Sequence, residues 1–473
     1  MRVLLVAMPD TISALDPILR IPNLGLCSIA GNLPGAEVRV LDLAFKRRKI
    51  DAFLASVIDD FRPGLVGLSA MSFQFSSACH VARLVKELAP STLTALGGYH
   101  ATLLAGEISR GSDASLFDFI VRGEGERTFA ALVRALDSGG GDFSRIPGLS
   151  FKSGGGFRHN PPAPAIDLDG LALPDRDCRI LNTPRFMGLR FDCAETSRGC
   201  SMGCKFCSIA CMYGRTIRTF GLDRVLRDLR NLFSGGTEGV FFVDDNITLD
   251  AGRLKALCRA IAAQKLNAMS YVTQASVAGI NADPELVDAM WDAGFRWVFL
   301  GIESGITRNL GALGKPGAVG GAAAAVRRLR DRGICVFGGF IVGSPGDSPA
   351  DIKATFRYAL DLGVDHAIVQ CLTPYPGTET REELLASGLV TNPDDFSRYN
   401  GFIANIRTQR METRELTNRI IRHGIRYYLD PRYIARSRLW RRHPALVPPL
   451  LLNNIRFVTD GLRNRMFHSR HTW

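Results

Sequence analysis

No uninterrupted apolar run of about 18 residues, the length of a membrane-spanning helix, occurs in this sequence of 473 residues. A secretory signal is also missing, because the apolar opening Met1–Val6 meets Pro9 and Asp10 too soon to form a signal core. The apolar fraction of 46% and the charged fraction of 22% are those of a globular protein. These features predict a cytoplasmic protein built from two or three domains.

Lysine is absent from the last 73 residues, although the chain as a whole is basic. Residues 401–473 contain 15 Arg and 4 acidic residues, so they carry +11 of the net charge of +12. The arginines surround aromatic and aliphatic residues, a composition that suits peripheral contact with an anionic surface such as the inner membrane. A helix that packs on the rest of the protein is an equal alternative, and nucleic-acid binding is less favoured than either. The segment includes Arg432, Tyr433, Arg436, Arg438, Leu439, Trp440, Arg441, Arg442 and the run 445–452.

Residues 1–150 alternate short apolar strands with segments of helical periodicity, such as Ser77–Leu88. This alternation predicts an α/β domain with a parallel, doubly wound sheet. Ligands of such sheets bind at the carboxyl ends of the strands, where this sequence has small and turn-forming residues. The expected strands are 3–6, 37–42, 65–69, 93–98 and 119–123.

Residues 151–185 are expected to form a linker, because they hold three consecutive glycines and the run Asn160–Pro164, which cannot continue a helix or a central strand. A second α/β series covers residues 186–375, with helical spacers of about 20–30 residues that favour a full or partial (β/α) barrel. Residues 376–473 are expected to form a helical, basic C-terminal region. The strands expected in the second series include 239–243, 271–273, 297–300, 336–340 and 366–370.

The eleven cysteines are an odd number, which does not suit a framework of disulfides, and three of them form the motif C-x3-C-x2-C. Cys200, Cys204 and Cys207 can bind three irons of a four-iron cluster, whereas a fully protein-bound cluster needs four cysteines. The missing fourth ligand leaves one iron open to a chelating small molecule. Gly199 and Gly203 let this loop fold tightly around a compact ligand.

A structural zinc site that uses Cys211 as its fourth ligand is the competing interpretation. Zinc knuckles usually separate two cysteine pairs, whereas these four cysteines lie in one short loop. The loop also follows the first expected strand of the barrel-like series, where active sites of barrels are built. Both features favour the iron–sulfur cluster. Four further cysteines in apolar or helical surroundings are expected to be small core residues: Cys193, Cys258, Cys335 and Cys371.

The three-cysteine motif resembles that of the radical SAM superfamily, and the resemblance extends through the barrel-like series to Thr373. It implies that the open iron binds the amino and carboxylate groups of S-adenosylmethionine. The segment Asp244, Asp245, Asn246 matches the part of the family that contacts the methionine amino group. Later strand ends match the lining of the nucleoside pocket: 273–276 with Ser276, 301–304 with Glu303, and 340–343.

The first domain resembles the cobalamin-binding domain that precedes many radical SAM cores. The D-x-H-x-x-G signature of an axial histidine is missing, and neither His80 nor His100 has its context, so we expect a corrinoid without a protein histidine on its lower face. A doubly wound domain that binds another nucleotide, or none, is the alternative. The strand ends that carry the resemblance imply corrinoid contacts by Ser69, Gly97, Gly98, Gly123 and Glu124.

Two further absences narrow the alternatives. No G-x-G-x-x-G opens the first helix, which argues against a dinucleotide site. A methylthiotransferase needs three more cluster cysteines in its N-terminal domain, and here that domain has only Cys27 and Cys79.

The resemblance implies a cobalamin-dependent radical SAM C-methyltransferase with a [4Fe-4S] cluster, S-adenosylmethionine and cobalamin as cofactors. The reduced cluster would cleave S-adenosylmethionine to a 5′-deoxyadenosyl radical that removes hydrogen from an unactivated carbon, and methylcobalamin would then supply the methyl group. The layout is similar to that of hopanoid C-3 methylases, which implies a lipid-like substrate and a reductant protein such as a flavodoxin or ferredoxin. The anaerobic cyclase of magnesium-porphyrin synthesis and a non-catalytic iron–sulfur sensor that binds nucleic acid are the alternatives.

Overall fold

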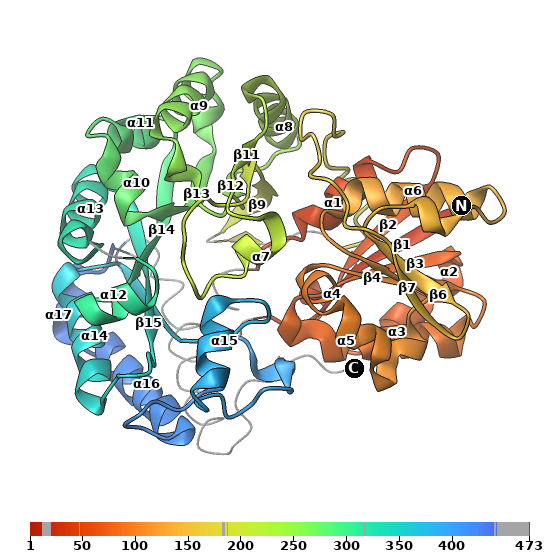
Figure 1. Ribbon diagram of the computed structural model, residues 1–473. Coiled ribbons are helices and arrows are strands. Elements are labelled where there is room, and N and C mark those ends of the chain that lie inside the picture. The colour runs from red at the N-terminus through yellow and green to blue at the C-terminus, as the bar shows by residue number, and fades with distance from the viewer. Residues whose placement is uncertain are drawn as a thin grey trace. The chain divides into compact units, whose positions relative to one another are not determined.

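The computed structural model describes residues 1–11, 20–46, 48–181, 185–186, 188–315, 318–438, 441 and 473. These residues form two compact units (Figure 1). The first contains the described residues up to 181 together with Trp473, and the second contains those from 185 to 441. Each unit is built on a largely parallel sheet with helices, which confirms the predicted fold class.

The sheet of the first unit has five parallel strands in the order β2-β1-β3-β4-β5, followed by the antiparallel strands β6 and β7. This order is doubly wound, because the chain moves to one edge and then returns past β1. The strands are β1 (Arg2–Ala7), β2 (Glu37–Asp42), β3 (Leu65–Ser69), β4 (Leu93–Gly97), β5 (Phe119–Val121), β6 (Leu149–Ser153) and β7 (Gly156–His159). The helices are α1 (Leu24–Gly31), α2 (Ile50–Phe61), α3 (Phe75–Leu88), α4 (Tyr99–Leu103), α5 (Ala105–Arg110) and α6 (Gly125–Asp137).

Alternate residues of β1 enter two separate hydrophobic clusters. Leu4 and Val6 belong to the cluster that includes buried residues of α2 and α3, whereas Val3 and Leu5 belong to the cluster that includes residues of α1 and α6. Helices therefore cover both faces of the sheet, as Figure 1 also shows. Because β1 is buried on both faces, its sequence is an uninterrupted apolar run.

The hairpin of β6 and β7 differs from the linker expected over residues 151–185. Its strands add an antiparallel extension to the first sheet. The turn is formed by Gly154 and Gly155, whose φ values of 60° and 86° are the left-handed conformations that the type I′ hairpin turn requires. The backbone of Val40 in β2 also donates to Cys178 and accepts from Ile180, so the end of the expected linker belongs to this unit as well.

The second unit contains six parallel strands and one short antiparallel strand, in the order β16-β15-β14-β13-β12-β9-β8. This is a half barrel, because β16 and β8 are the two edges of an open sheet. The strands are β8 (Arg185–Phe186), β9 (Leu189–Ala194), β12 (Gly239–Phe242), β13 (Ser270–Ser276), β14 (Phe295–Glu303), β15 (Cys335–Val342) and β16 (His366–Cys371).

Helices of the second unit lie on the outer side of the curved sheet (Figure 1), and two short strands precede and follow the cysteines. Every residue of β15 is buried, which explains its continuous apolar sequence. The remaining elements are β10 (Ser197–Arg198), α7 (Ile209–Tyr213), β11 (Arg218–Thr219), α8 (Leu222–Ser234), α9 (Ala251–Ala263), α10 (Val277–Ala282), α11 (Leu286–Asp292), α12 (Thr307–Ala312), α13 (Ala318–Arg332), α14 (Pro349–Leu362), α15 (Glu379–Ala386), α16 (Thr413–Tyr428) and α17 (Pro431–Arg436).

The first part of the basic tail packs against the half barrel. Asp365 is fully buried, and its carboxylate accepts from the Arg438 backbone N–H at 2.9 Å and from Arg330 Nη1 at 3.1 Å. Its backbone carbonyl accepts from the hydroxyls of Tyr433 at 3.2 Å and Ser437 at 3.0 Å. The packing alternative therefore holds as far as residue 438. Trp440, Arg442 and the run 445–452 lie outside the described residues.

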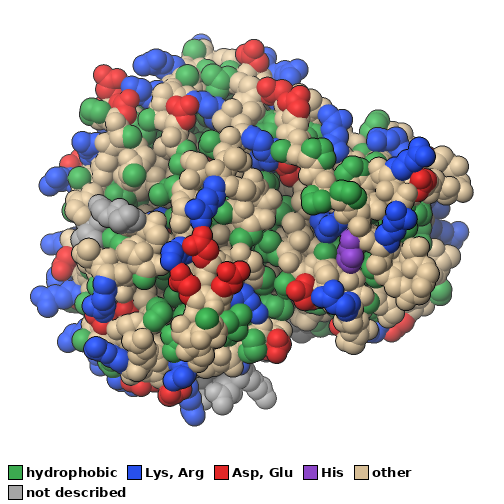
Figure 2. Space-filling model, in the orientation of Figure 1, with side chains coloured by type: hydrophobic (Ala, Val, Ile, Leu, Met, Phe, Trp, Pro, Cys, Tyr) green, Lys and Arg blue, Asp and Glu red, His purple; other side chains and the backbone are tan. Residues whose placement is uncertain are grey.

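Large apolar side chains are exposed only at scattered positions in the described ranges, and Figure 2 shows green atoms interspersed with basic and acidic side chains on the visible face. No described helix has both the length and the hydropathy needed to cross a membrane. The exposed large apolar residues are Met71, Leu88, Phe233, Leu385, Leu429 and Ile434.

Candidate active site

Residues 199–208, here called the cysteine loop, connect β10 to α7 beyond the carboxyl end of β9. The thiols of Cys200, Cys204 and Cys207 are free and partly buried. Burial, together with the neighbouring thiols of Cys204 and Cys200, raises the pKa of Cys207 to about 12. Cys200 and Cys204 act electrostatically on Cys207, and bound metal ions would supply the positive charge that stabilises the three thiolates. The donor set therefore suits three corners of an iron–sulfur cluster.

Cys211 lies in a different environment. Its Sγ donates to the carbonyl of Gly377 at 3.0 Å. Burial raises the pKa of Cys211, which lies in α7. The charged groups that raise this pKa further are Glu382 and Glu379, not the three cysteines of the cysteine loop. This placement disfavours the zinc alternative, which needs Cys211 as a fourth ligand. The four cysteines expected in the core are buried with at most 3% exposure: Cys193, Cys258, Cys335 and Cys371.

Helix α15 holds the outer side of the cysteine loop. Lys205 Nζ pairs with Glu383 at 2.5 Å, and the Lys205 carbonyl accepts from the Thr380 N–H at 3.2 Å. Arg215, just beyond α7, pairs with Glu379. Residues that follow the half barrel in sequence therefore fix a loop that lies at its beginning.

Asp244, after β12, fixes the segment that leads into the loop. Its side chain is 1% exposed and accepts from the Thr196 N–H at 2.9 Å, the Thr196 hydroxyl at 2.6 Å and the Ser197 hydroxyl at 2.5 Å. Arg253 in turn donates to the Thr196 carbonyl at 2.8 Å. These partners occupy its carboxylate, which suits a role in fixing this segment, and the cofactor contact expected from the sequence stays a prediction.

Asp245 lies beside the cysteines. Its Oδ2 accepts from the Gly199 N–H at 3.0 Å, and Gly199 has a φ of 85° and approaches the Thr216 carbonyl too closely for a Cβ atom. Burial raises the pKa of Asp245 to about 6. Asp245 also raises the pKa of Cys200 and Cys207, so its carboxyl group is close to the proposed cluster ligands. This position suits a contact with a cationic amino group.

Asn246 and Ser276 are linked through Thr248. The Thr248 hydroxyl donates to Asn246 Oδ1 at 2.7 Å and accepts from the Ser276 N–H at 3.2 Å. Asn246 Nδ2 donates to the thioether of Met202, in the cysteine loop, at 3.5 Å. The structure therefore brings these two predicted residues together at the ends of the neighbouring strands β12 and β13.

Glu303 ends β14 in a strained conformation. Its φ is 64°, in the left-handed region, and the register with β15 shifts between Gly301 and Glu303. A non-glycine residue in such a conformation costs about 1–3 kcal/mol and is found where the surrounding structure enforces it. Here Glu303 Oε1 pairs with Lys315 Nζ at 2.5 Å. The sequence predicted Glu303 as a site residue but gave no signal for Lys315, which follows a short helix of no clear periodicity.

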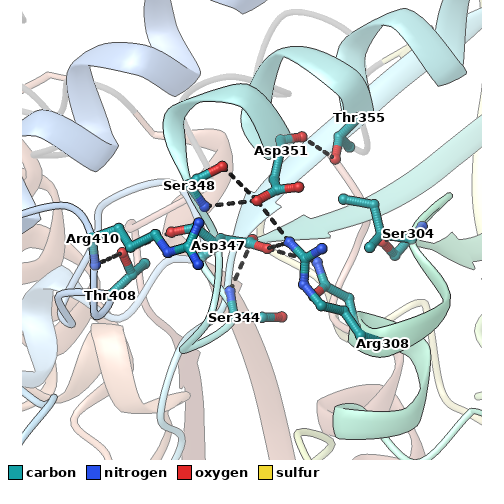
Figure 3. Close-up of polar contacts among 12 residues, drawn as sticks. Ser304, Arg308, Ser344, Asp347, Ser348, Asp351, Thr355, Thr408 and Arg410 are labelled. Atoms are coloured by element: carbon teal, nitrogen blue, oxygen red, sulfur yellow. Dashed lines mark hydrogen bonds and ion pairs between the residues drawn. The ribbon is translucent and has the colours of Figure 1, made fainter.

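Figure 3 shows a polar cluster at the end of β15. The buried carboxylate of Asp347 accepts from the N–H groups of Gly343 at 2.8 Å and Ser344 at 3.1 Å, and Arg308 pairs with Asp351 at 2.6 Å. This network fixes the turn that follows β15. It also leaves the Ser344 hydroxyl buried without a hydrogen-bond partner in the described part of the chain.

The Thr273 hydroxyl in β13 is likewise buried without a partner among the described residues. Thr273 and Ser344 lie within or just beyond the strand segments that the sequence assigned to the nucleoside pocket. Unsatisfied buried hydroxyls are costly unless a ligand or water completes their hydrogen bonds. The two hydroxyls therefore fit a polar ligand at these strand ends.

In the first unit, the residues expected to contact the corrinoid lie at the carboxyl ends of the parallel strands. Ser69 and Gly97 are register partners at the ends of β3 and β4. Gly98 follows with a φ of 93°, and a Cβ atom there would lie 2.7 Å from the Ala70 carbonyl oxygen. Glu124 is the residue before the first turn of α6, and its Oε2 accepts from the Ile166 N–H at 3.3 Å. Gly123 also has a positive φ, and its N–H donates to the Thr102 hydroxyl at 2.9 Å.

Both histidines considered in the sequence are engaged within the first unit. His80 Nε2 lies 3.0 Å from Asp51 Oδ1, and its ring contacts that of Trp473. His100 is 2% exposed and its ring packs against that of Phe75 at an interplanar angle of 32°, with ring centroids 4.2 Å apart. Burial lowers the pKa of His100 to about 4. These contacts agree with a corrinoid that has no protein histidine on its lower face, which stays a prediction.

Comparison with known proteins places both units in families. Residues 194–359 match the model of the radical SAM superfamily, and residues 18–133 match that of the B12 binding domain. An uncharacterised methyltransferase of Pyrococcus horikoshii is 30% identical over 94% of this chain and 96% of its own length. A hopanoid C-3 methylase of Methylococcus capsulatus is 28% identical, over 76% of this chain and 68% of its own.

An anaerobic magnesium-protoporphyrin IX monomethyl ester cyclase of Cereibacter sphaeroides is also 28% identical, over 86% of this chain and 68% of its own. Among solved structures, the radical S-adenosylmethionine methyltransferase TsrM of Kitasatospora setae, with cobalamin and a [4Fe-4S] cluster bound, has a TM-score of 0.67 at 20% identity. The match covers 83% of this chain and 79% of that one. This likeness shows a shared fold.

Proposed function

Because this chain belongs to the cobalamin-dependent radical SAM methyltransferases, we propose that it methylates an unactivated carbon of a lipid-like substrate, with a hopanoid at C-3 as the candidate. The observation that supports the proposal is the set of three free, partly buried thiols in the cysteine loop, whereas Cys211 lies in α7 and donates to the Gly377 carbonyl. The cofactors of the family are a [4Fe-4S] cluster, S-adenosylmethionine and cobalamin.

The cluster and cobalamin, when bound, supply the one-electron chemistry and the methyl transfer. The chain's own residues hold the reacting groups. Cys200, Cys204 and Cys207 would bind the cluster, and Asp245 would accept a hydrogen bond from the amino group of S-adenosylmethionine. Asp244 would act indirectly, because its hydrogen bonds to Thr196 and Ser197 hold the chain segment that leads into the cysteine loop.

A small-molecule substrate and an electron donor are needed for this reaction. We propose a low-potential donor protein such as a flavodoxin or ferredoxin as the reductant. The hopanoid is supported by the relative from Methylococcus capsulatus and by the apolar, arginine-rich tail. The cyclase from Cereibacter sphaeroides has the same identity to this chain, so a porphyrin is the second candidate.

Anaerobic reconstitution with iron, sulfide and hydroxocobalamin tests the two substrates directly. We expect a hopanoid incubated with reductant and S-adenosylmethionine to gain one methyl group by mass spectrometry. A porphyrin substrate that is consumed while the hopanoid stays unchanged would contradict the hopanoid proposal and favour the cyclase. If S-adenosylmethionine is cleaved and neither compound changes, both candidates are wrong and the methyltransferase assignment is unaffected.

The tail gives a separate prediction about membranes. Arg436 and Arg441 are exposed, whereas the backbone of Arg438 is fixed by Asp365. Each Arg near an anionic surface contributes about 1 kcal/mol, so Arg436→Gln with Arg441→Gln should weaken binding to phosphatidylserine vesicles by ~30-fold at low salt. Vesicle sedimentation measures this loss. The matched control is Arg327→Gln with Arg328→Gln, two exposed arginines of α13.

Wild-type vesicle binding should itself weaken as salt rises, because the interaction is electrostatic. Cleavage of S-adenosylmethionine without substrate should stay at the wild-type level in both double variants. If the tail variant and the control bind vesicles equally, these arginines do not contact the membrane.

A further inference from the structure

Lys315 is a buried cation that the proposed function does not yet use. Its Nζ lies 2.5 Å from Glu303 Oε1, and both side chains are 11% exposed. Gly301 leaves room for this pair, because a Cβ atom there would lie 2.8 Å from Glu303 Oε1 and 3.4 Å from Lys315 Nζ. Glu303 ends β14 in a strained conformation, and in this conformation its carboxylate points at the ammonium group of Lys315.

The segment that carries Lys315 is attached to the cysteine loop. The carbonyl of Leu313, the residue directly after α12, accepts from the Lys205 N–H at 3.2 Å. Gly314 has a φ of 75°, and a Cβ atom there would lie 2.7 Å from the Gly203 carbonyl oxygen. The backbone of Lys315 is fixed as well, because its N–H donates to the Leu310 carbonyl at 2.7 Å.

The ammonium group is held beside the cysteine loop. The two residues before Lys315 contact Gly203 and Lys205, which flank Cys204 on either side. A charge held in a buried site acts more strongly on its neighbours than the same charge in water. The pair therefore presents two opposite charges next to the proposed cluster ligands.

We propose that Lys315 and Glu303 are positioning residues that set the reduction potential of the [4Fe-4S] cluster. The cluster gains one electron from the external donor and becomes more negative by one charge. The buried ammonium group stabilises that charge, and the carboxylate opposes it. This inference rests on the proposed ligation by Cys200, Cys204 and Cys207.

Redox titration of the reconstituted enzyme, followed by electron paramagnetic resonance without S-adenosylmethionine, tests the proposal. Lys315→Met, which keeps the length and removes the charge, should decrease the ratio of reduced to oxidised cluster at least tenfold at a fixed potential. This corresponds to a midpoint about 59 mV more negative for a one-electron couple. Glu303→Gln should shift the midpoint in the opposite direction, because it removes the opposing negative charge.

Lys315→Arg should keep the midpoint near the wild-type value. Lys255→Met is the matched control, because Lys255, on α9, also pairs with two carboxylates, those of Asp283 and Glu285 between α10 and α11. Its midpoint should not change. Opposite shifts from Lys315→Met and Glu303→Gln would not result from a general loss of structure, so the pair remains informative even if one variant is less stable.

Equal midpoints in Lys315→Met, Glu303→Gln and wild type would overturn the proposal, as would shifts of the same sign. So would an unchanged midpoint with weaker binding of S-adenosylmethionine, which would make Lys315 a substrate contact instead. Iron and sulfide content, measured on the same samples, separates these outcomes from an error in the ligand assignment. Wild-type protein that assembles no four-iron cluster would contradict the ligation itself.

Discussion

Replacement of Cys200, Cys204 or Cys207 by Ala is expected to abolish the visible absorbance of the cluster and the cleavage of S-adenosylmethionine. A four-iron cluster held by three cysteines already lacks one protein ligand, so the loss of a second leaves two irons without one. The loop cannot replace the ligand, because Cys211 donates to Gly377 and has Glu379 and Glu382 as its charged neighbours. The visible absorbance of the cluster, the iron and sulfide content and product formation measure the loss.

Cys211→Ala is the matched control for these variants. It removes a thiol of the same loop region, and it should leave both the absorbance and the cleavage activity largely intact. The apoproteins should unfold at similar temperatures, since none of the four thiols is fully buried. Loss of metal in Cys211→Ala, together with zinc in the purified protein, would establish the structural zinc site instead.

Gly98→Ala is expected to destabilise the first unit by about 2–5 kcal/mol, because it combines backbone strain with a steric clash. The φ of 93° is a conformation that residues with a Cβ atom rarely adopt, and that atom would lie 2.7 Å from the Ala70 carbonyl oxygen. The strand end cannot easily move, since the Ala70 N–H donates to Gly97 and the Ala70 carbonyl accepts from His100. Denaturant unfolding monitored by circular dichroism measures the effect.

Gly97→Ala separates the needs of the fold from those of the corrinoid. A Cβ atom at Gly97 would have its nearest contacts at 3.8 Å, so the fold tolerates it, and unfolding should change by less than about 0.5 kcal/mol. If the corrinoid approaches the backbone at this strand end, the added methyl group should weaken hydroxocobalamin binding at least tenfold in a calorimetric titration. Wild-type affinity in Gly97→Ala would remove Gly97 from the corrinoid contacts.

The parallel strands were the most predictable part of the fold. Most of them are buried on both faces and are therefore apolar runs bounded by turn residues, whereas the edge strand β2 is partly exposed; all ten strands expected from the sequence are present within a few residues. The cysteine motif was equally visible, because its spacing is local. The glycines at 154 and 155 were misread as part of a linker, since glycine suits a flexible segment and a type I′ turn alike.

The roles of the acidic residues could not be predicted in the same way. Asp244 and Asp245 are adjacent in sequence, yet one is enclosed by Thr196 and Ser197 and the other lies beside the cysteines. The difference depends on which way each side chain points from the end of β12. Lys315 was missed for a related reason, because its contact with Glu303 arises from the strained end of β14, which has no sequence signature.

The attachment of α15 to the cysteine loop has a consequence for the order of events during synthesis. The ion pair between Lys205 and Glu383 joins residues 178 positions apart. At about 5–20 residues per second, a ribosome takes about 10–35 s to add that length of chain. During this interval the three thiols have been made, while Thr380, Glu379 and Glu383, which hold the outer side of their loop, do not yet exist. A cluster inserted before α15 is complete would therefore enter a loop that is open on that side, whereas one inserted afterwards meets a loop already fixed in place.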